Sequence, residues 1–176
     1  MSNIQVLATE RQIRQAVRRI AREVSRRYQE ESILLVGVLT GAFVFMADLA
    51  RELYRMGMTD VEIEFIDISS YSGTESGQIR FDRDLTVPIS GRHVVIVEDI
   101  IDTGATLAFL LKLLEVREPA SLIVVALFNK VTRRVETLPS ERIITGIDLP
   151  NKFVVGYGLD RNGKFRHLPF VGIVAS

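Results

Sequence analysis

The fold of this chain is decided by residues 94–107, which read VVIVEDIIDTGATL from Val94 to Leu107. The apolar and mostly β-branched start, with His93, predicts a strand over His93–Val97 that is buried in a parallel sheet. Acidic and small polar residues follow, and the apolar pattern that resumes after them predicts a helix over Ala105–Val116. Strand, loop and helix in this order are typical of an α/β fold.

The loop of this stretch has two features that indicate a bound sugar phosphate. Glu98 and Asp99 are adjacent carboxylates, and their repulsion at the tip of a buried strand is unfavourable unless a divalent metal or ribose hydroxyls offset it. Thr103-Gly104-Ala105-Thr106 offers backbone N–H groups and two hydroxyls at a helix N-terminus, where phosphates bind. The alternative is an ordinary helix cap with solvent-facing acids. We favour the phosphate site because strand, paired acids, loop and helix follow in the right order. The loop matches neither the Walker nor the dinucleotide-binding pattern, so an NTPase and a dehydrogenase lose their usual support.

The composition narrows the function classes. Hydrophobic residues make up 47% of the 176 residues, which favours one globular domain. Lys+Arg and Asp+Glu are equal at 22 each, and this balance argues against a general nucleic-acid binder. The sequence has no cysteine, which excludes disulfides and thiolate metal sites. Neither an apolar leader nor a run of about 18 apolar residues is found, so we expect a cytoplasmic protein without a membrane partner.

Strands and helices alternate along the rest of the chain. Thr9 and Gln12 form a capping box that opens a helix, whose basic face we interpret as solvated rather than as an RNA or membrane surface. Further elements are expected as strands at Ile33–Leu39, Val61–Ile68, Ser121–Phe128 and Phe153–Val155, a helix at Ala42–Met56, and a polar loop at Ser69–Asp82. This alternation predicts a mainly parallel central sheet flanked by helices, with ligands beyond the carboxyl ends of the strands.

Val94–Gly104 resembles the phosphoribosyl-diphosphate motif of the type I phosphoribosyltransferases, and its form Glu-Asp-Ile-Ile-Asp-Thr-Gly is similar to the hypoxanthine-guanine branch. The resemblance covers nearly the whole chain. Leu39-Thr40-Gly41-Ala42 is similar to the diphosphate-binding loop, Ser69-Ser70-Tyr71 to the start of the flexible catalytic loop, and Phe153–Asp160 to the purine-binding end. The resemblance implies one domain over residues 1–176, a catalytic loop at about 69–82, and a small hood formed by terminal segments.

The resemblance also implies a reaction and a role for each site residue. The reaction is Mg²⁺-dependent transfer of the 5-phosphoribosyl group from phosphoribosyl diphosphate to N9 of hypoxanthine or guanine, in purine salvage. Asp102 would be the general base at purine N7, and Ser70 and Tyr71 would take part in loop closure. Other roles follow the family pattern: Glu98 and Asp99 for the ribose hydroxyls and, with Asp160, for Mg²⁺; Asp102, Thr103, Gly104, Ala105 and Thr106 for the 5′-phosphate; Thr40, Gly41 and Arg166 for diphosphate; Lys130, Phe153 and Val154 for the base.

The sequence departs from the family pattern at two positions and leaves some questions open. Thr40 stands where lysine is common in the diphosphate loop, and Val131 stands where a basic residue often follows Lys130, although Arg133 and Arg134 are close. Two alternatives remain. One is a regulator on the same fold that binds phosphoribosyl diphosphate or RNA, and the other is a family member selective for xanthine or a pyrimidine homologue. The sequence does not rank hypoxanthine, guanine and xanthine. The family implies a homodimer or homotetramer, and the sequence does not choose between them.

Overall fold

The structure is a computed structural model that describes residues 4–70 and 79–174. Its strands are β1 (Ile4–Ala8), β2 (Ile33–Leu39), β3 (Val61–Ser70), β4 (Ile79–Arg83), β5 (His93–Ile101), β6 (Ser121–Asn129), β7 (Ile143–Asp148) and β8 (Val171–Val174). Its helices are α1 (Glu10–Tyr28), α2 (Phe43–Arg55) and α3 (Ala105–Glu115), with short 3₁₀ turns at Val131–Arg133 and Ser140–Arg142. No helix of the described residues is both long and apolar enough to cross a membrane.

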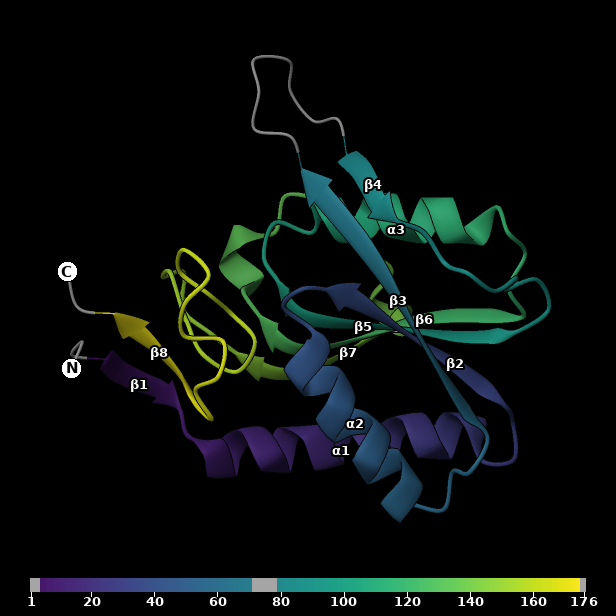
Figure 1. Cartoon of the computed structure of the whole chain (residues 1–176), viewed down its shortest axis with the longest axis horizontal. Helices are drawn as coiled ribbons and strands as arrows, with labels where there is room; N and C mark the ends of the chain where they lie inside the picture. Colours follow the sequence, from purple (N-terminus) through teal and green to yellow (C-terminus); the bar gives the residue numbers. More distant parts are fainter. Residues whose placement is uncertain (1–3, 71–78, 175–176) are drawn as a thin grey trace.

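A six-stranded sheet with the order β4-β3-β2-β5-β6-β7 forms the centre of the molecule (Figure 1). Every neighbouring pair is parallel except β3 with β4, which are antiparallel at one edge. β1 and β8 pair antiparallel beside this sheet and form a small hood from the two terminal segments. The predicted fold class, a mainly parallel sheet flanked by helices with a terminal hood, is confirmed.

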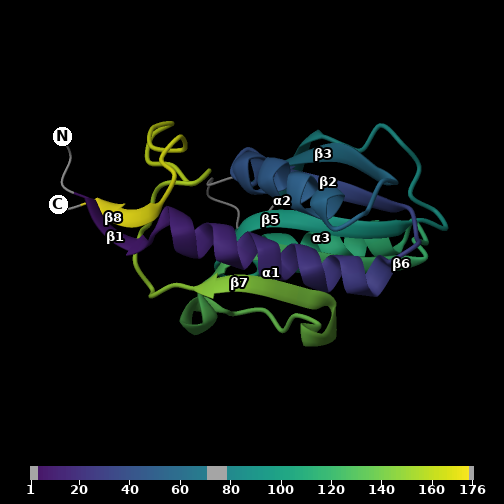
Figure 2. The same ribbon diagram turned by 90° about the horizontal axis from the view of Figure 1, so that it is seen from below.

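The core lies on both faces of the sheet because alternate strand residues point to opposite sides. Leu35, Val95 and Ile123 pack with α1 and α2 in one apolar cluster. The residues just before them on the same strands, Leu34, Val94 and Leu122, pack with α3 in a second apolar cluster. Figure 1 shows the resulting layers, with α1 and α2 below the sheet and α3 above it, and in Figure 2, seen from below, α1 crosses in front of the sheet. The central strands are continuously apolar because both faces of the sheet are covered by helices. The carboxyl ends of the parallel strands remain uncovered by these helices, and the candidate site described below lies there.

Several element predictions are confirmed within about one residue. The capping box of Thr9 and Gln12 opens α1, with the Thr9 hydroxyl accepting from the Gln12 backbone and the Gln12 amide oxygen accepting from the Thr9 backbone. β2 has the predicted bounds, α2 is one residue shorter than predicted at each end, and α3 is one residue shorter at its C-terminal end.

Three sequence predictions differ from the structure. β5 continues to Ile101, so Glu98 and Asp99 belong to the strand instead of following it. The expected strand Phe153–Val155 is wrong, because only Val155 of these residues makes a bridge, to Gly172 of β8. The predicted loop Ser69–Asp82 is too long at both ends, since β3 reaches Ser70 and β4 begins at Ile79; residues 71–78 lie outside the described residues.

Candidate active site

The topology brings three chain segments to one edge of the sheet. β2, β5 and β6 are parallel neighbours, so the residues at their carboxyl ends meet at the same edge. Gly41 follows β2, Asp99 and Asp102 lie at the end of β5, and Lys130 follows β6. All four line a cavity of about 390 Å³.

This cavity contains most of the predicted substrate residues. Its lining includes Phe153, Val154, Asp160 and Arg166 from the hood side, together with Ile100, Arg133, Asn151, Lys152 and Leu159, which the sequence did not single out. Thr40, Glu98 and the run Thr103–Thr106 are adjacent in the chain to lining residues but are outside the lining itself. The structure therefore brings together, around one cavity, residues that the sequence suggested for the purine base, the ribose and the diphosphate.

The end of β5 leads into a tight loop at the N-terminus of α3. Gly104 is the N-cap of this helix with a left-handed φ of 87°, and no side chain of the described residues caps it. The Thr103 carbonyl accepts from the backbone N–H groups of Val135 and Glu136 at 3.0 and 3.3 Å, which holds the loop against the segment after β6. The first turn of α3 carries no acidic residue. An uncapped helix N-terminus with small residues and a fixed loop is suited to a phosphate group.

The paired carboxylates of β5, Glu98 and Asp99, are partly buried. Burial, with the Asp99 charge as a second cause, raises the pKa of Glu98 well above its usual range. Burial raises the pKa of Asp99 to about 6, although the Ile100 backbone N–H and the Arg166 charge lower it. Such shifts arise where two acids share a poorly solvated place, so a cation or hydroxyl donors would stabilise the ionised pair.

Asp99 is in close contact with the loop after β2. A Cβ atom built on Gly41 would lie 1.6 Å from Asp99 Oδ2, so only glycine fits opposite this carboxylate. The Leu39–Thr40 peptide bond of the same loop is cis, and Thr40 itself is exposed. The backbone of the predicted diphosphate loop thus lies directly against the predicted ribose and metal residues.

Asp102 lies between the two cations Lys130 and Arg133, at the part of the cavity suggested for the purine base. Lys130, which is 5% exposed, places Nζ 3.1 Å from Asp102 Oδ2. Arg133 Nε is 3.1 Å from Asp102 Oδ1, yet that oxygen is buried and makes no hydrogen bond to any described residue. A buried acceptor without a donor is uncommon, and here it belongs to a side chain that lines the cavity beside Lys130. The Asp102 carboxylate thus retains an unused hydrogen-bond acceptor at the cavity wall.

Arg134, which the sequence also suggested as a nearby cation, is bonded to Asn129. Its Nη2 donates to Asn129 Oδ1 at 2.5 Å, and Asn129 in turn donates to Asp148 of β7 at 2.8 Å. Arg134 is absent from the cavity lining, so of the two arginines only Arg133 is next to Asp102.

The hood side of the cavity is ordered by hydrogen bonds around Asp160 and Arg166. Arg166 Nη2 lies 2.8 Å from Asp160 Oδ1, and Arg166 Nη1 donates to the Gly158 carbonyl at 2.5 Å. Asp160 Oδ2 accepts from the Gly163 backbone at 2.8 Å. The two residues that resemble metal and diphosphate ligands are therefore paired with each other.

Two predicted aromatic and apolar residues flank the opening. Phe153 is 64% exposed although it is a large apolar side chain, and Val154 beside it is buried. An exposed ring at the mouth of a cavity can stack on a planar ligand. Of the predicted loop residues, Ser70 ends β3 without a described side chain, and Tyr71 lies outside the described residues.

Among residues 4–70 and 79–174, no three acidic or histidine side chains form a cluster that could hold a metal alone. Glu98, Asp99 and Asp160 thus do not make a closed metal site. Mg²⁺ commonly takes one or two carboxylates and completes its shell with substrate oxygens and water. An open pair of unneutralised carboxylates fits that mode of binding.

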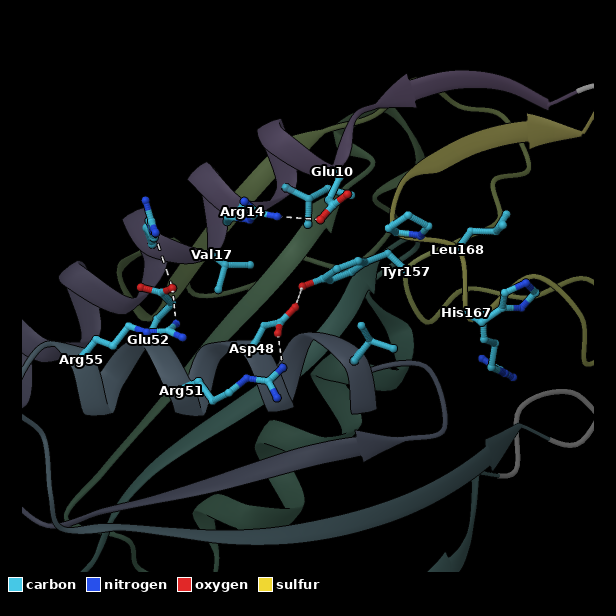
Figure 3. A pocket seen from close by; sticks show the side chains of 15 residues that line it. Glu10, Arg14, Val17, Asp48, Arg51, Glu52, Arg55, Tyr157, His167 and Leu168 are labelled. Atoms are coloured by element: carbon cyan, nitrogen blue, oxygen red, sulfur yellow. Dashed lines mark hydrogen bonds and ion pairs between the residues drawn. The ribbon is translucent and has the colours of Figure 1, made fainter.

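A second and larger cavity, of about 690 Å³, lies between α1, α2 and the hood (Figure 3). Of the predicted site residues, only Arg166 is in its lining. Its acids and arginines are largely paired with each other, as in Glu10–Arg14 and Asp48–Arg51. The smaller cavity therefore holds the candidate chemistry.

Comparisons with known proteins agree with this geometry. The model of the phosphoribosyl transferase domain family matches residues 5–162. The chain is 37% identical to the hypoxanthine-guanine phosphoribosyltransferase of Bacillus subtilis, over 96% of this chain and 92% of that protein. It is 40% identical to the hypoxanthine phosphoribosyltransferase of Haemophilus influenzae, over 98% and 96%. The solved structure of the Trypanosoma cruzi hypoxanthine phosphoribosyltransferase in complex with the product IMP is 36% identical, with a TM-score of 0.89 over 99% of this chain and 95% of that one.

Proposed function

This chain belongs to the phosphoribosyl transferase domain family, and from that premise we propose that it is a purine salvage enzyme acting on hypoxanthine and guanine. It transfers the 5-phosphoribosyl group of phosphoribosyl diphosphate to N9 of the base. The bond from C1′ to the diphosphate oxygen breaks, the bond from C1′ to N9 forms, and diphosphate leaves. The products are IMP or GMP.

The observation that best supports this reaction is the pairing of Asp102 with Lys130. Asp102 Oδ1 is a buried acceptor without a hydrogen bond among the described residues, and Lys130 Nζ lies 3.1 Å from the other oxygen of the same carboxylate. A 6-oxopurine offers an N–H at N7 and an acceptor oxygen at C6 on neighbouring positions. Asp102 would accept the N7 proton as general base, and Lys130 would donate to the C6 oxygen.

Lys130 also gives a physical basis for rejecting adenine. Adenine carries an amino group at C6, which is a donor and would leave the buried ammonium without an acceptor. Sites that are built to hydrogen-bond one group reject an analogue that lacks it, because the unpaired polar group loses its partner. Phe153 would stack on the purine ring and Val154 would contact its edge through the backbone.

The phosphate groups are assigned to the two loops at the sheet edge. Backbone N–H groups of Thr103–Thr106 at the start of α3 would hold the 5′-phosphate, as helix N-termini do for anions. Thr40 and Gly41 would present backbone donors to the diphosphate, with the Arg166 guanidinium on its other side. The Thr40 side chain carries no charge, so the positive charge next to the leaving group would come from Arg166.

Mg²⁺ is proposed as the cofactor on the chemistry of the donor set. Glu98 and Asp99 are partly buried acids whose pKa values are raised above their usual range, so a divalent ion would relieve their repulsion. Asp160 lies close enough to raise the pKa of Asp99 and would reach the same ion on release from Arg166. Bound there, Mg²⁺ would neutralise charge on the departing diphosphate.

The remaining sequence predictions stay predictions. Ser70 and Tyr71 would close over the reaction as part of the segment at about 69–82, and closure of this kind excludes water. Three other predictions also stay predictions: a single domain over the whole chain, assembly into a homodimer or homotetramer, and a cytoplasmic location.

A base panel tests the proposal. The protein is incubated with phosphoribosyl diphosphate, Mg²⁺ and one of hypoxanthine, guanine, xanthine or adenine, and the nucleotide formed is measured. We expect product with hypoxanthine or guanine and none with adenine. Absence of product with every 6-oxopurine would reject the enzyme. Binding of phosphoribosyl diphosphate without any product would instead support the regulator, and product with xanthine alone would support the xanthine-selective enzyme.

A further inference from the structure

Tyr157 lies in the C-terminal segment that leads to the hood strand β8, and its side chain joins this segment to α2 by a hydrogen bond. Its hydroxyl donates to Asp48 Oδ2, and Figure 3 shows this contact crossing the larger cavity, with Arg51 on the far side of the Asp48 carboxylate. Tyr157 is 6% exposed. Burial and the Asp48 contact raise the pKa of Tyr157 far above its usual range, so the hydroxyl remains a donor at any physiological pH. In this bond Tyr157 is therefore always the donor and Asp48 of α2 the acceptor.

Tyr157 lies at the base of the hood strap, which we define as residues 157–168. Its backbone N–H donates to the Leu168 carbonyl at 2.9 Å, and the next N–H, of Gly158, donates to the Arg166 carbonyl at 2.9 Å. The strap is therefore closed at its base by two backbone bonds. Its interior carries Asp160 and Arg166, the pair on the diphosphate side of the active site.

The strap touches the diphosphate loop at the residue next to Tyr157. Gly158 has a left-handed φ of 98°, and a Cβ atom built on it would lie 2.1 Å from the Gly41 carbonyl oxygen. This approach has no room for a side chain. The position of the strap relative to Gly41 is thus closely constrained.

Helix α2 is the natural reference for this contact, because it begins at Phe43, directly after the loop that contains Gly41. Asp48 lies in the second turn of α2, so the Tyr157–Asp48 bond ties the strap to the same rigid element that carries the diphosphate loop. Gly41, Asp99 and Arg166 come from segments far apart in the sequence, and their relative placement depends on such tertiary contacts.

We infer that Tyr157 is a positioning residue for phosphoribosyl diphosphate, acting through Asp48 to hold the Asp160–Arg166 strap against the Gly41 loop. The inference rests on the proposed function and adds a specific residue to it. Without the bond, the strap would occupy its binding position for a smaller fraction of the time. The apparent affinity for phosphoribosyl diphosphate would fall by that fraction, while the purine contacts of Asp102 and Lys130 would be unaffected.

The test compares Tyr157→Phe, Asp48→Ala and the double variant with the unmodified protein. The Tyr157→Phe substitution keeps the aromatic ring in place and removes only the hydroxyl. Asp48→Ala removes the acceptor and leaves Arg51, which is 63% exposed, in solvent. Tyr54→Phe is the matched control, since it removes a phenol hydroxyl from the same helix at a position 71% exposed. For each protein, the Kd for phosphoribosyl diphosphate with Mg²⁺ is measured by calorimetry, along with the KM for hypoxanthine, kcat and Tm.

We expect each single variant to raise the Kd for phosphoribosyl diphosphate about tenfold, as for loss of a hydrogen bond to a charged group. The KM for hypoxanthine should stay within about twofold, the Tyr54→Phe control should match the unmodified protein, and the double variant should be no weaker than the worse single variant. An unchanged Kd, with or without a lower Tm, would overturn the inference, as would equal losses for both substrates. If one variant fails to fold, the other decides by the same criteria. Absence of nucleotide from the unmodified protein would reject the proposed function, and the Kd comparison would still decide this inference.

Discussion

Replacing Gly41 by alanine is expected to abolish most of the activity while leaving the protein folded. The added Cβ would lie 1.6 Å from Asp99 Oδ2, and ordinary contact begins at 3.4 Å, so the carboxylate must retreat by about 2 Å. Overpacking of this kind costs about 1–3 kcal/mol. Tm falls by roughly 2–4 °C for each kcal/mol in a chain of this size, which leaves the native state populated at 25 °C.

The loss of activity should exceed the loss of stability. A misplacement of about 1 Å at a reacting site can lower the rate about 100-fold, and Asp99 would move further than that. We therefore expect kcat/KM for phosphoribosyl diphosphate to fall at least about 100-fold, by a steady-state assay of IMP formation at 25 °C. The same substitution should raise the Kd for phosphoribosyl diphosphate in calorimetry, because both the diphosphate loop and the ribose carboxylate shift.

Gly91→Ala is the control for the stability effect. Gly91 has a φ of 70° with no described atom within 4 Å of a built Cβ, so alanine there is strained by about 1–2 kcal/mol without a clash and far from the cavity. It should lower Tm by a comparable amount and keep full activity. Activity of Gly41→Ala within about threefold of the unmodified protein would refute the contact between Gly41 and Asp99 as part of the site.

Three further predictions concern other groups. Asp102→Asn should lower kcat by about 10²–10⁴-fold, as for a lost general base, with little change in the Kd for phosphoribosyl diphosphate; equal losses in both would contradict its role. Lys130→Ala should raise the KM for hypoxanthine about 10–100-fold, and an unchanged value would argue against the C6 contact. Glu64→Gln should destabilise the protein by about 2 kcal/mol at pH 7 in urea unfolding, because buried Glu64 accepts from Thr86, Phe65 and Arg83. The Thr86 hydroxyl is the largest cause of the lowered pKa of Glu64, so its contribution is present above the unfolded-state pKa and is lost as pH falls through the folded-state value. The difference between the two proteins should shrink in acid, and a constant difference would contradict the assignment.

Much of the fold could be predicted because its central strands are buried on both faces. Ile33–Leu39 and Ser121–Phe128 are continuous apolar runs, and the structure has strands at both places. β7 was missed because it is the edge strand of the sheet and is only partly buried, with Thr145 and Gly146 interrupting its apolar residues. β4 was hidden for a similar reason, since it is a short, polar edge strand within a segment that composition alone marks as a loop.

The false strand at Phe153–Val155 shows the limit of a short apolar run. Its residues are apolar because Val154 and Val155 are buried in the hood and Phe153 lies exposed at the cavity mouth. The one pairing partner in this segment is Gly172, which bonds to the Val155 backbone from 17 positions later in the chain. Local periodicity does not show whether such a partner exists.

The sequence indicated which residues lie together at the sheet edge, but it did not indicate most of their contacts. Asp102 and Lys130 follow neighbouring strands, so their proximity follows from sheet order once the strands are known. The position of Arg133 beside Asp102 depends on the 3₁₀ turn after β6, and the Tyr157–Asp48 bond depends on how the hood packs on α2. Both are tertiary contacts between separate segments, and the only available signal was the presence of a polar residue in a family motif or on a helix.

The central claim is phosphoribosyl transfer to a 6-oxopurine, and simultaneous measurement of both products tests it most directly. The protein is mixed with phosphoribosyl diphosphate, Mg²⁺ and hypoxanthine, and IMP and diphosphate are quantified over time. The account predicts equal molar amounts of the two at every time point, with little diphosphate released when hypoxanthine is omitted. Diphosphate release without IMP, or formation of neither product, would contradict it.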